Sequence, residues 1–296
     1  MDHIEEFKLY LKTEKTASDS TCSAYLGDLK EFDAYLLQER GKTPETAGNA
    51  DIAAYLMALK SSGRNPSTVN LKMSSVRCYY AFLLEKGKVM TNPAAGIRSP
   101  KMAPKALDYL TVEQMESLLD IDGTDPKSLR DKAILELMYA TGMRAGEMAS
   151  ADVKDADLTI GFIVCSTEGK SRIIPIGKPA LEALKTYLQQ ARPALVKADS
   201  GESALFVNYQ GSRITRQGIW KLIRFYGEKA GLGSGLNPQV MRNSFAAHML
   251  QNGADLKSLQ ELMGLEDINA AKLYLTVTKK RIMDVYDKTH PRAMKP

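Results

Sequence analysis

The sequence has few of the residues that build disulfide frameworks and metal sites. It holds three cysteines and three histidines in 296 residues. Cys22, Cys78 and Cys165 are scattered and odd in number, without the spacing of a zinc site. This pattern is typical of a protein kept in a reducing cytoplasm and argues against structural disulfides. We therefore expect a cytoplasmic protein that holds no metal ion and needs no cofactor.

Long hydrophobic runs are also missing. No stretch of about 18 apolar residues occurs, so no membrane span is expected. The N-terminal residues are acidic and amphipathic, without the basic start and apolar run of a secretory signal. The formal net charge of +5 is mildly basic. Such a charge is compatible with a DNA partner, although many enzymes share it.

Helical periodicity dominates the first hundred residues. Apolar residues recur at helical spacing there, which predicts four or five helices with short connections. We expect Ser20 to cap the second of these helices. Three prolines and a glycine within residues 91–104 then break the pattern. The sequence thus predicts a helical domain over residues 1–90 and a linker over residues 91–106.

The remaining residues, 107–296, predict a second and mostly helical domain with a small antiparallel sheet. Thr111 and Gln114 have the spacing of a capping box at its first helix. Two short β-rich runs, 162–165 and 172–176, flank a glycine-containing turn and indicate a β-hairpin. The expected fold class is therefore mainly α, and α+β overall. Helical patterns occupy residues 129–139, 180–188, 216–226, 237–251, 255–262, 267–275 and 279–287.

Four short motifs in the second domain carry chemistry. In chain order they are Thr141-Gly-Met-Arg144-Ala-Gly-Glu147, Gln239-x-x-Arg242, Met263-Gly264-Leu265 and Tyr274. Arginine suits a phosphate clamp because its planar fork binds two oxygens at once and keeps its charge. A tyrosine phenol can act as a nucleophile that forms a covalent intermediate. Such residues could serve phosphoryl transfer through a tyrosine, although a single arginine is more often a surface charge and a single tyrosine on an apolar helix is more often buried in the core.

The order and spacing of these motifs resemble the C-terminal signature of the Xer-type tyrosine recombinases, which cut and rejoin DNA through a tyrosine. The resemblance continues through the helical N-terminal domain, the linker at Asn92-Pro93 and the closing residues 290–293. It implies a SAM-like core-binding domain followed by a catalytic domain. It also implies double-stranded DNA as the partner and a homo- or hetero-tetramer on DNA, formed through the C-terminal helix.

The resemblance further implies roles for the residues that match. Arg144 and Arg242 would clamp the non-bridging oxygens of the phosphate, with Glu147 supporting the first arginine. Tyr274 would attack the phosphorus and form a 3′-phosphotyrosyl link. A second tyrosine near the C-terminus, Tyr286, is expected to stay structural.

Several positions depart from the family pattern. The hairpin lysine that would protonate the leaving oxygen falls on Thr167, and the two expected histidines fall on Gln239 and Leu265. Asn243 stands where a histidine often follows the second arginine. None of these side chains can give up a proton near neutral pH. Lys170 would replace the lost lysine only if the hairpin turn shifts, because a hairpin fixes which side chains face inward.

Basic and polar side chains outside the motifs are candidates for a DNA-facing surface. Most such contacts would be made to phosphates and would carry little sequence information. Taken singly, each of these residues is more often a solvated surface group. The candidates are Arg64, Ser67, Lys72 and Arg77 in the first domain, and Arg172, Arg213, Arg216 and Lys221, beside Lys170, in the second.

Three hypotheses stay open. The first is a site-specific recombinase that cleaves DNA through Tyr274 during recombination or integration. The second is a catalytically impaired DNA-binding relative, or a partner subunit that depends on a competent one. The third is a helical protein unrelated to DNA. Covalent trapping on nicked duplex separates the first two, and duplex binding at low salt tests the third.

Overall fold

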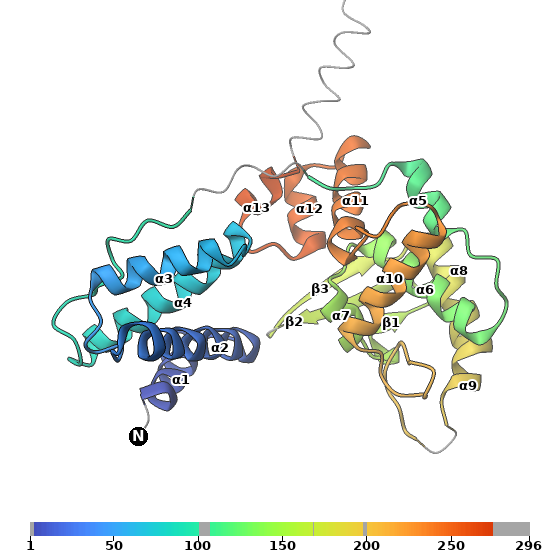
Figure 1. Ribbon diagram of the computed structural model, residues 1–296. Helices are drawn as coiled ribbons and strands as arrows, with labels where there is room; N and C mark the ends of the chain where they lie inside the picture. Colours follow the sequence, from blue (N-terminus) through green and yellow to red (C-terminus); the bar gives the residue numbers. More distant parts are fainter. Residues whose placement is uncertain (1–2, 101–106, 168, 198–199, 275–296) are drawn as a thin grey trace, which may run out of the picture. The chain divides into compact units, whose positions relative to one another are not determined.

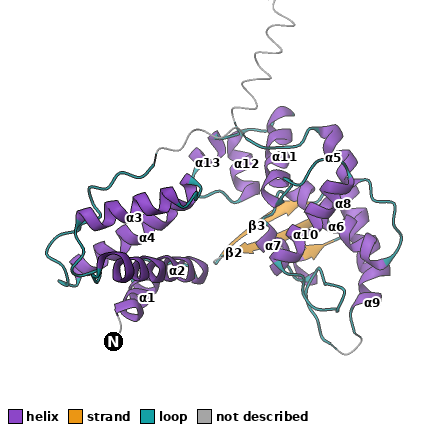
Figure 2. Cartoon of the chain, viewed as in Figure 1, coloured by secondary structure: helices purple, strands orange, loops and turns teal. Residues whose placement is uncertain are grey.

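The computed structural model describes residues 3–100, 107–167, 169–197 and 200–274. The chain divides into two compact units, Met1–Lys105 and Ala106–Pro296. Helices make up most of both units, and the described strands all belong to the second (Figures 1 and 2). The fold is mainly helical with a small antiparallel sheet, as the fold class predicts. Within these ranges no helix is long and apolar enough to cross a membrane.

The first unit is a helical bundle with an aromatic core. A π-helical turn, Leu36–Arg40, extends its second helix. The helices are α1 (His3–Thr13), α2 (Asp19–Tyr35), α3 (Asn49–Ser61) and α4 (Pro66–Glu85). Large buried rings fill the space between them, and these rings are Phe7, Phe32, Tyr55, Tyr79, Tyr80 and Phe82. The spacing of apolar residues therefore did predict which faces meet.

Side-chain caps fix where these helices begin. The Ser18 hydroxyl accepts a hydrogen bond from the backbone N–H of Thr21, so the expected cap at Ser20 is wrong by two residues. Asn65 caps α4 in the same way. Pro66 follows it at the first helical position, where the missing N–H costs nothing.

The second unit combines nine α-helices, a 3-10 turn (Val153–Asp155), a π-helical turn (Tyr187–Ala191) and three strands in its described ranges. Its helices are α5 (Val112–Leu119), α6 (Pro126–Thr141), α7 (Ala145–Ser150), α8 (Lys178–Thr186), α9 (Arg192–Leu195), α10 (Arg216–Lys229), α11 (Pro238–Gln251), α12 (Leu256–Met263) and α13 (Ile268–Lys272). The strands are β1 (Ala156–Asp157), β2 (Phe162–Thr167) and β3 (Lys170–Pro175), in the order β1-β2-β3. The largely buried α6 packs against α8 and α11. The predicted capping box is present, since Thr111 and Gln114 exchange side-chain and backbone hydrogen bonds.

The register of the hairpin decides which side chains share a face. β2 and β3 pair antiparallel, with Ile163 opposite Ile174 and Thr167 opposite Lys170. Directly opposed residues of an antiparallel pair point to the same side of the sheet. Ile163 and Ile174 are buried, so this side faces the core. Lys170 therefore shares the side of Thr167 without any shift of the turn, and the expectation that the register turns it away is wrong.

Two glycines end the helices that lead into the candidate site. Gly142 ends α6 and Gly264 ends α12, each in the left-handed region with φ of 59°. A Cβ atom added at Gly142 would collide with the ring of Phe245. One added at Gly264 would meet Nη1 of Arg172 at 2.8 Å. Glycine is required at both places because of the backbone conformation and the close neighbour.

The C-terminal helices agree only partly with the prediction. α13 ends at Lys272, so Tyr274 lies in the turn after it rather than inside a helix over 267–275. The backbone N–H of Tyr274 donates to the carbonyl of Ala271 at 3.0 Å, which closes this turn. The expected helix over 279–287, Tyr286 and residues 290–293 lie outside the described residues.

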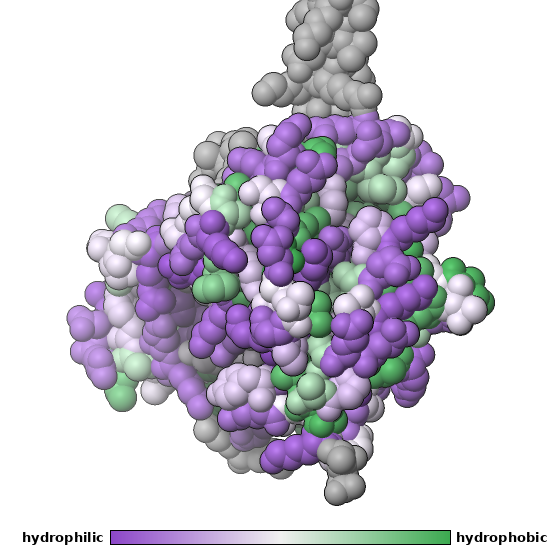
Figure 3. Space-filling view, turned by 90° about the vertical axis from the view of Figure 1, so that its right-hand side faces the viewer, coloured by the Kyte–Doolittle hydropathy of each residue, from purple (hydrophilic) through white to green (hydrophobic). Residues whose placement is uncertain are grey.

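The surface in the view of Figure 3 is mainly hydrophilic, with hydrophobic side chains in small groups between the hydrophilic ones. Exposed apolar side chains of the second unit include Ile160, Tyr209 and Phe225. The Lys127 ammonium lies 5.1 Å from the centre of the Phe225 ring, so a cation partly covers that ring. The candidate site described below is a cluster of polar side chains and not one of these apolar groups.

Candidate active site

The carboxylate of Glu147 is the centre of the first polar cluster. α7 begins at Arg144, whose backbone N–H donates to Oε2 of Glu147 at 2.7 Å. The Arg144 guanidinium also donates from Nη1 to Oε1 of Glu147 at 2.9 Å. The Arg144 side chain is nevertheless 47% exposed, whereas that of Glu147 is 3% exposed. Glu147 therefore holds the arginine in place and leaves part of its fork open to a ligand.

Arg172 of β3 completes this cluster. Its Nη1 and Nη2 atoms donate to Oε1 and Oε2 of Glu147 at 3.0 and 2.8 Å, a bidentate pair. Its Nε atom donates to the carbonyl of Leu262 at 2.8 Å. With the side chain only 14% exposed and each of its three guanidinium nitrogens engaged, Arg172 ties the hairpin to α12. The structure thus gives Arg172 a structural role in place of the expected DNA contact.

Thr167 belongs to the same cluster. Its hydroxyl donates to Oε1 of Glu147 at 3.2 Å. Burial alone would raise the pKa of Glu147, but hydrogen bonds from Arg172 and the Arg144 backbone, with both arginine charges, lower it to about 2. The carboxylate is therefore ionised at neutral pH. Thr167, at the position where a lysine was expected, donates its hydroxyl hydrogen to the Glu147 carboxylate and has no other side-chain donor.

Arg242 of α11 is the buried arginine of the site. It is 4% exposed, and its Nη1 and Nη2 atoms donate to the carbonyls of Gly142 and Met263, the second at 2.6 Å. Arg144 donates from Nη2 to the next carbonyl of that loop, Gly264, at 3.3 Å. Burial, with the charge of Arg144, lowers the pKa of Arg242 to about 10, so it stays protonated at neutral pH. The two predicted clamp arginines therefore converge on the Met263–Gly264 turn, and Arg242 also binds the turn at Gly142.

Tyr274 lies at the end of a buried hydrogen-bond chain. It is 4% exposed, and its Oη atom donates to Oδ1 of Asn243 at 3.2 Å. The same Oδ1 accepts a hydrogen bond from Nε2 of Gln239 at 2.8 Å. Nδ2 of Asn243 donates to the carbonyl of Asp108 at 2.8 Å. A carbonyl can only accept, so it orients the Asn243 amide and leaves Oδ1 to accept the hydrogen bond from the phenol.

The hydrogen bonds around Tyr274 and Asn243 keep the Tyr274 phenol neutral. Burial raises the pKa of Tyr274, while the charges of Arg242 and Arg144 oppose the rise. An amide oxygen accepts a hydrogen bond but does not take up a proton. In this arrangement Tyr274 is held in its protonated form, with its hydroxyl bound to Asn243.

Leu265 and His248 contribute packing and structure. Leu265 packs against the apolar cluster that contains Tyr274 and Met263. It offers a ligand no polar side-chain atom. The ring of His248 lies between the hydroxyl of Tyr139 and the carbonyl of Leu110, at 2.8 and 2.9 Å. Both ring nitrogens of His248 are therefore engaged in contacts within the protein.

Two candidate DNA contacts, Lys72 of α4 and Arg64 just before this helix, form an ion-pair group with carboxylates of α2. The Lys72 ammonium lies 2.8 Å from Asp28 and 2.9 Å from Glu31, with the lysine side chain 9% exposed. Arg64 pairs with Glu31 at 3.0 Å and is 39% exposed. Lys72 therefore links two helices of the bundle, and only Arg64 of this pair keeps a surface on which DNA could lie.

The other two candidates of the first unit are also engaged. Nη2 of Arg77 donates to the carbonyl of Ile97 and to the hydroxyl of Ser99, both at 2.7 Å. The Ser67 hydroxyl donates to Oδ1 of Asn65 within the helix cap. Arg77 therefore ties the segment after α4 back onto this helix, and Ser67 supports its first turn.

The remaining candidate DNA contacts of the second unit include one arginine engaged within the protein and two exposed side chains. Arg213 donates to the carbonyls of Ala149 and Ala151 at the end of α7 and pairs with Asp152 at 2.5 Å. It therefore caps the helix that carries Glu147. Arg216 and Lys221 are exposed on α10 and keep the accessibility that a phosphate contact needs.

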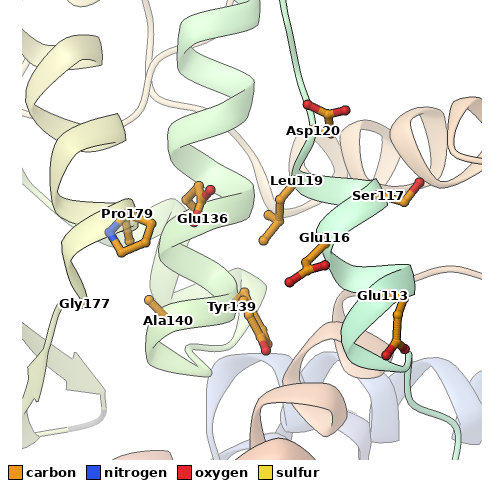
Figure 4. A pocket seen from close by; sticks show the side chains of 11 residues that line it. Glu113, Glu116, Ser117, Leu119, Asp120, Glu136, Tyr139, Ala140, Gly177 and Pro179 are labelled. Atoms are coloured by element: carbon orange, nitrogen blue, oxygen red, sulfur yellow. The ribbon is translucent and has the colours of Figure 1, made fainter.

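A pocket of about 760 Å³ lies apart from these arginines, between α5, α6 and the start of α8. In Figure 4 the carboxylates of Glu113, Glu116 and Asp120 stand around it, with Glu136 and Tyr139 on α6. Such a lining repels phosphate, so the pocket is not the candidate site. Within the described ranges, no group of His, Cys, Asp or Glu side chains is arranged to hold a metal ion.

Sequence reasoning missed the main-chain part of the site. The carbonyls of Gly142, Met263 and Asp108 hold the two key side chains, Arg242 and Asn243. Every residue carries a carbonyl, so no sequence signal marks these three. Glu266 was also missed, although a carboxylate directly after the Met263-Gly264-Leu265 motif is visible in the sequence.

Comparison with known proteins gives the same family from family models and from individual relatives. Residues 108–281 match the model of the Phage integrase family, and residues 4–87 match that of the Phage integrase, N-terminal SAM-like domain. Tyrosine recombinase XerD of Oceanobacillus iheyensis is 39% identical over 98% of this chain and 98% of the relative. Tyrosine recombinase XerD of Listeria innocua is 38% identical over 99% of each.

Among solved structures, the XerH site-specific recombinase bound to palindromic difH substrate in a post-cleavage complex has a TM-score of 0.75. The match covers 96% of this chain and 83% of that one at 19% identity, a likeness that concerns the fold alone. The Tn1549 transposon integrase in complex with transposon right end DNA has a TM-score of 0.74 at 17% identity, over 96% of this chain and 99% of that one.

Proposed function

Because this chain belongs to the phage integrase family of tyrosine recombinases, we propose that it binds duplex DNA and cleaves and rejoins it at a specific site through Tyr274. One observation supports this most: Arg144 and Arg242 both donate to carbonyls of the Met263–Gly264 turn, and the buried Tyr274 packs in one apolar cluster with Met263. The similarity to two tyrosine recombinases named XerD supports the same process.

The proposed reaction needs few groups. The Tyr274 oxygen attacks phosphorus, the bond to the 5′-oxygen breaks, and a 3′-phosphotyrosyl link forms. The phenol proton passes to solvent and the 5′-oxygen takes up a proton. Arg144 and Arg242 stabilise the charge that grows on the non-bridging oxygens. No metal ion or cofactor takes part in this scheme.

A second candidate function is a DNA-binding relative that cleaves very slowly or depends on a competent partner subunit. Two observations favour it. Thr167 is committed to Glu147, and Leu265 is apolar, so both leave a phosphate without their usual donors. Tyr274 is held as a neutral phenol by Asn243. Each missing acid–base or charge-stabilising group typically costs on the order of 10²–10³-fold in rate.

DNA binding is tested first by selection. The protein is incubated with a random duplex library at low salt, and the retained sequences are amplified and sequenced. We expect retention that weakens steeply with salt, because phosphate contacts dominate the affinity. Variants Arg216→Ala and Lys221→Ala should lower the affinity and reduce the salt dependence. If no duplex is retained, the chain is not a DNA-binding protein and both proposals fail.

Cleavage is tested on a nicked form of the selected duplex. Loss of the short fragment beyond the nick prevents religation and traps the covalent complex. We expect a denaturant-resistant adduct that Tyr274→Phe abolishes and that Tyr209→Phe, which alters an exposed surface tyrosine, leaves unchanged. Retention of duplex without any adduct would favour the second candidate function.

The assembly and cellular place are part of the same proposal. We infer a homo- or hetero-tetramer on DNA, joined through the C-terminal residues, and association with the nucleoid. Mass measurement of the protein on its selected duplex tests the assembly, because a tetramer joins two duplexes and a dimer occupies one.

A further inference from the structure

The cleavage scheme lacks one group, the donor of a proton to the departing 5′-oxygen. Thr167 stands at the position where this donor is expected, and its hydroxyl is bound to Glu147. In the proposed scheme Arg144 and Arg242 bind the non-bridging oxygens, so neither of them is assigned to this proton transfer. A side chain on the same face of the hairpin as Thr167 could fill the gap.

The strand register places Lys170 on that face. Thr167 and Lys170 are directly opposed, as are Cys165 and Arg172 one step further along the ladder. Arg172 shows that a long side chain of β3 on this face reaches the site, since it contacts Glu147. Opposed Cβ atoms in an antiparallel pair lie about 4.5–5.5 Å apart. The four-carbon stem of Lys170 can therefore bring its ammonium to the space that a lysine at Thr167 would use.

The position of the Lys170 ammonium agrees with this reach. Its Nζ atom lies 3.2 Å from Oε1 of Glu266. Glu266 follows the turn whose carbonyls, at Met263 and Gly264, bind the two clamp arginines. The two side chains of the pair are 80% and 84% exposed. Such an exposed pair is weak and exchanges readily, so an arriving phosphate can compete for the lysine.

We propose that Lys170 is the proton donor to the 5′-oxygen in this chain, supplied from across the hairpin, and that Glu266 holds its ammonium while DNA is absent. The inference rests on the proposed function. As the Tyr274 oxygen binds phosphorus and the bond to the 5′-oxygen breaks, the Lys170 proton moves to that oxygen. Lys170 then regains a proton from solvent.

The test uses two nicked duplexes of the selected sequence, one with the natural 5′-oxygen and one with a 5′-bridging sulfur. A thiolate leaves without protonation, so the sulfur duplex needs no acid. We expect Lys170→Ala to slow single-turnover cleavage of the oxygen duplex by about 10²–10³-fold and of the sulfur duplex by less than about 5-fold. Lys154→Ala, which alters an exposed lysine outside the site, should change neither rate.

Two further variants sharpen the test. Thr167→Lys should restore oxygen-duplex cleavage to Lys170→Ala, because the new lysine occupies the opposed position on the same face. Glu266→Gln should change the cleavage rate at saturating DNA when Lys170 is present and should have no effect in the Lys170→Ala background. A double-mutant cycle of these two substitutions measures this coupling.

Each remaining outcome overturns the proposal. If Lys170→Ala cleaves the oxygen duplex at the wild-type rate, or if the sulfur duplex does not rescue it, Lys170 is not the donor. A wild-type protein that cleaves only the sulfur duplex has a working nucleophile and no acid. This result would refute Lys170 as the proton donor and would agree with Tyr274 as the nucleophile. A wild-type protein that cleaves neither duplex contradicts the proposed cleavage function itself.

Discussion

Replacing Glu147 by glutamine tests the electrostatic account of the site. The carboxylate is buried and accepts hydrogen bonds from Arg144, Arg172 and Thr167. These contacts lower its pKa from 4.5 to about 2 against the effect of burial. At about 1.4 kcal/mol for each pKa unit, the ionised folded state gains about 3 kcal/mol at neutral pH.

The variant Glu147→Gln keeps the shape and removes the charge. Its amide group also turns N–H donors toward the Arg172 fork, which has only donors to offer. We expect the free energy of unfolding to fall by about 3 kcal/mol at neutral pH. A group with a lowered folded pKa contributes stability above its unfolded pKa and loses it as the pH falls through the folded one. The gap between wild type and variant should therefore close between about pH 4.5 and about pH 2.

The assay is urea unfolding followed by tryptophan fluorescence. Trp220 is the single tryptophan of the sequence and lies on α10, so it reports on the second unit. Glu266→Gln is the control, because the Glu266 side chain is 84% exposed and should change stability by less than about 0.5 kcal/mol. A Glu147→Gln variant as stable as wild type at neutral pH, or a gap that persists unchanged to about pH 2, would refute the reasoning.

Three further outcomes follow from the same contacts. Arg242→Lys should lose about 1–3 kcal/mol of stability by urea unfolding and about 10²-fold in cleavage, because one ammonium cannot bind two carbonyls as the fork does. Asn243→Ala should lose about 2–3 kcal/mol, since it leaves the Asp108 carbonyl and the Tyr274 hydroxyl without partners; an unchanged midpoint would contradict this hydrogen-bond chain. Restoring the family residues together, as Thr167→Lys, Gln239→His and Leu265→His, should raise single-turnover cleavage at least 10²-fold; no gain on any selected duplex would show that these positions are wrongly aligned.

The fold was largely predictable because its signals are local. Helical spacing predicted the four helices of the first unit, and Thr111 with Gln114 predicted the start of α5. Boundaries were less predictable, since Ser18 and Ser20 are chemically equal caps and only the fold selects Ser18. α13 is shorter than its apolar pattern suggests, and it leaves Tyr274 in a turn.

The candidate site was predictable as a set of side chains but not as a network. Arg144, Arg242 and Tyr274 were identified because their motifs resemble those of the tyrosine recombinases. The role of Lys72 did not, because its carboxylates at Asp28 and Glu31 lie more than forty residues away in sequence. Such pairings depend on which helices meet, and a single sequence does not state that.

The hairpin shows the same limit at shorter range. The β-rich runs predicted two strands but not their pairing, and the pairing of Thr167 with Lys170 decides which lysine faces the site. A change of one residue in register would have placed Lys170 on the opposite side. From the sequence alone, Lys170 was only an alternative to the missing lysine at Thr167. The observed register places it on the same face as Thr167.

The most direct measurement of the central claim is the identity of the residue that becomes attached to DNA. The adduct trapped on the nicked duplex is digested with trypsin and nuclease, and the nucleotide-bearing peptide is sequenced by mass spectrometry. The account predicts the modification on peptide 273–279, in which Tyr274 is the only tyrosine. A modification on any other peptide, or a protein that binds its selected duplex tightly and yields no modified peptide, would contradict it.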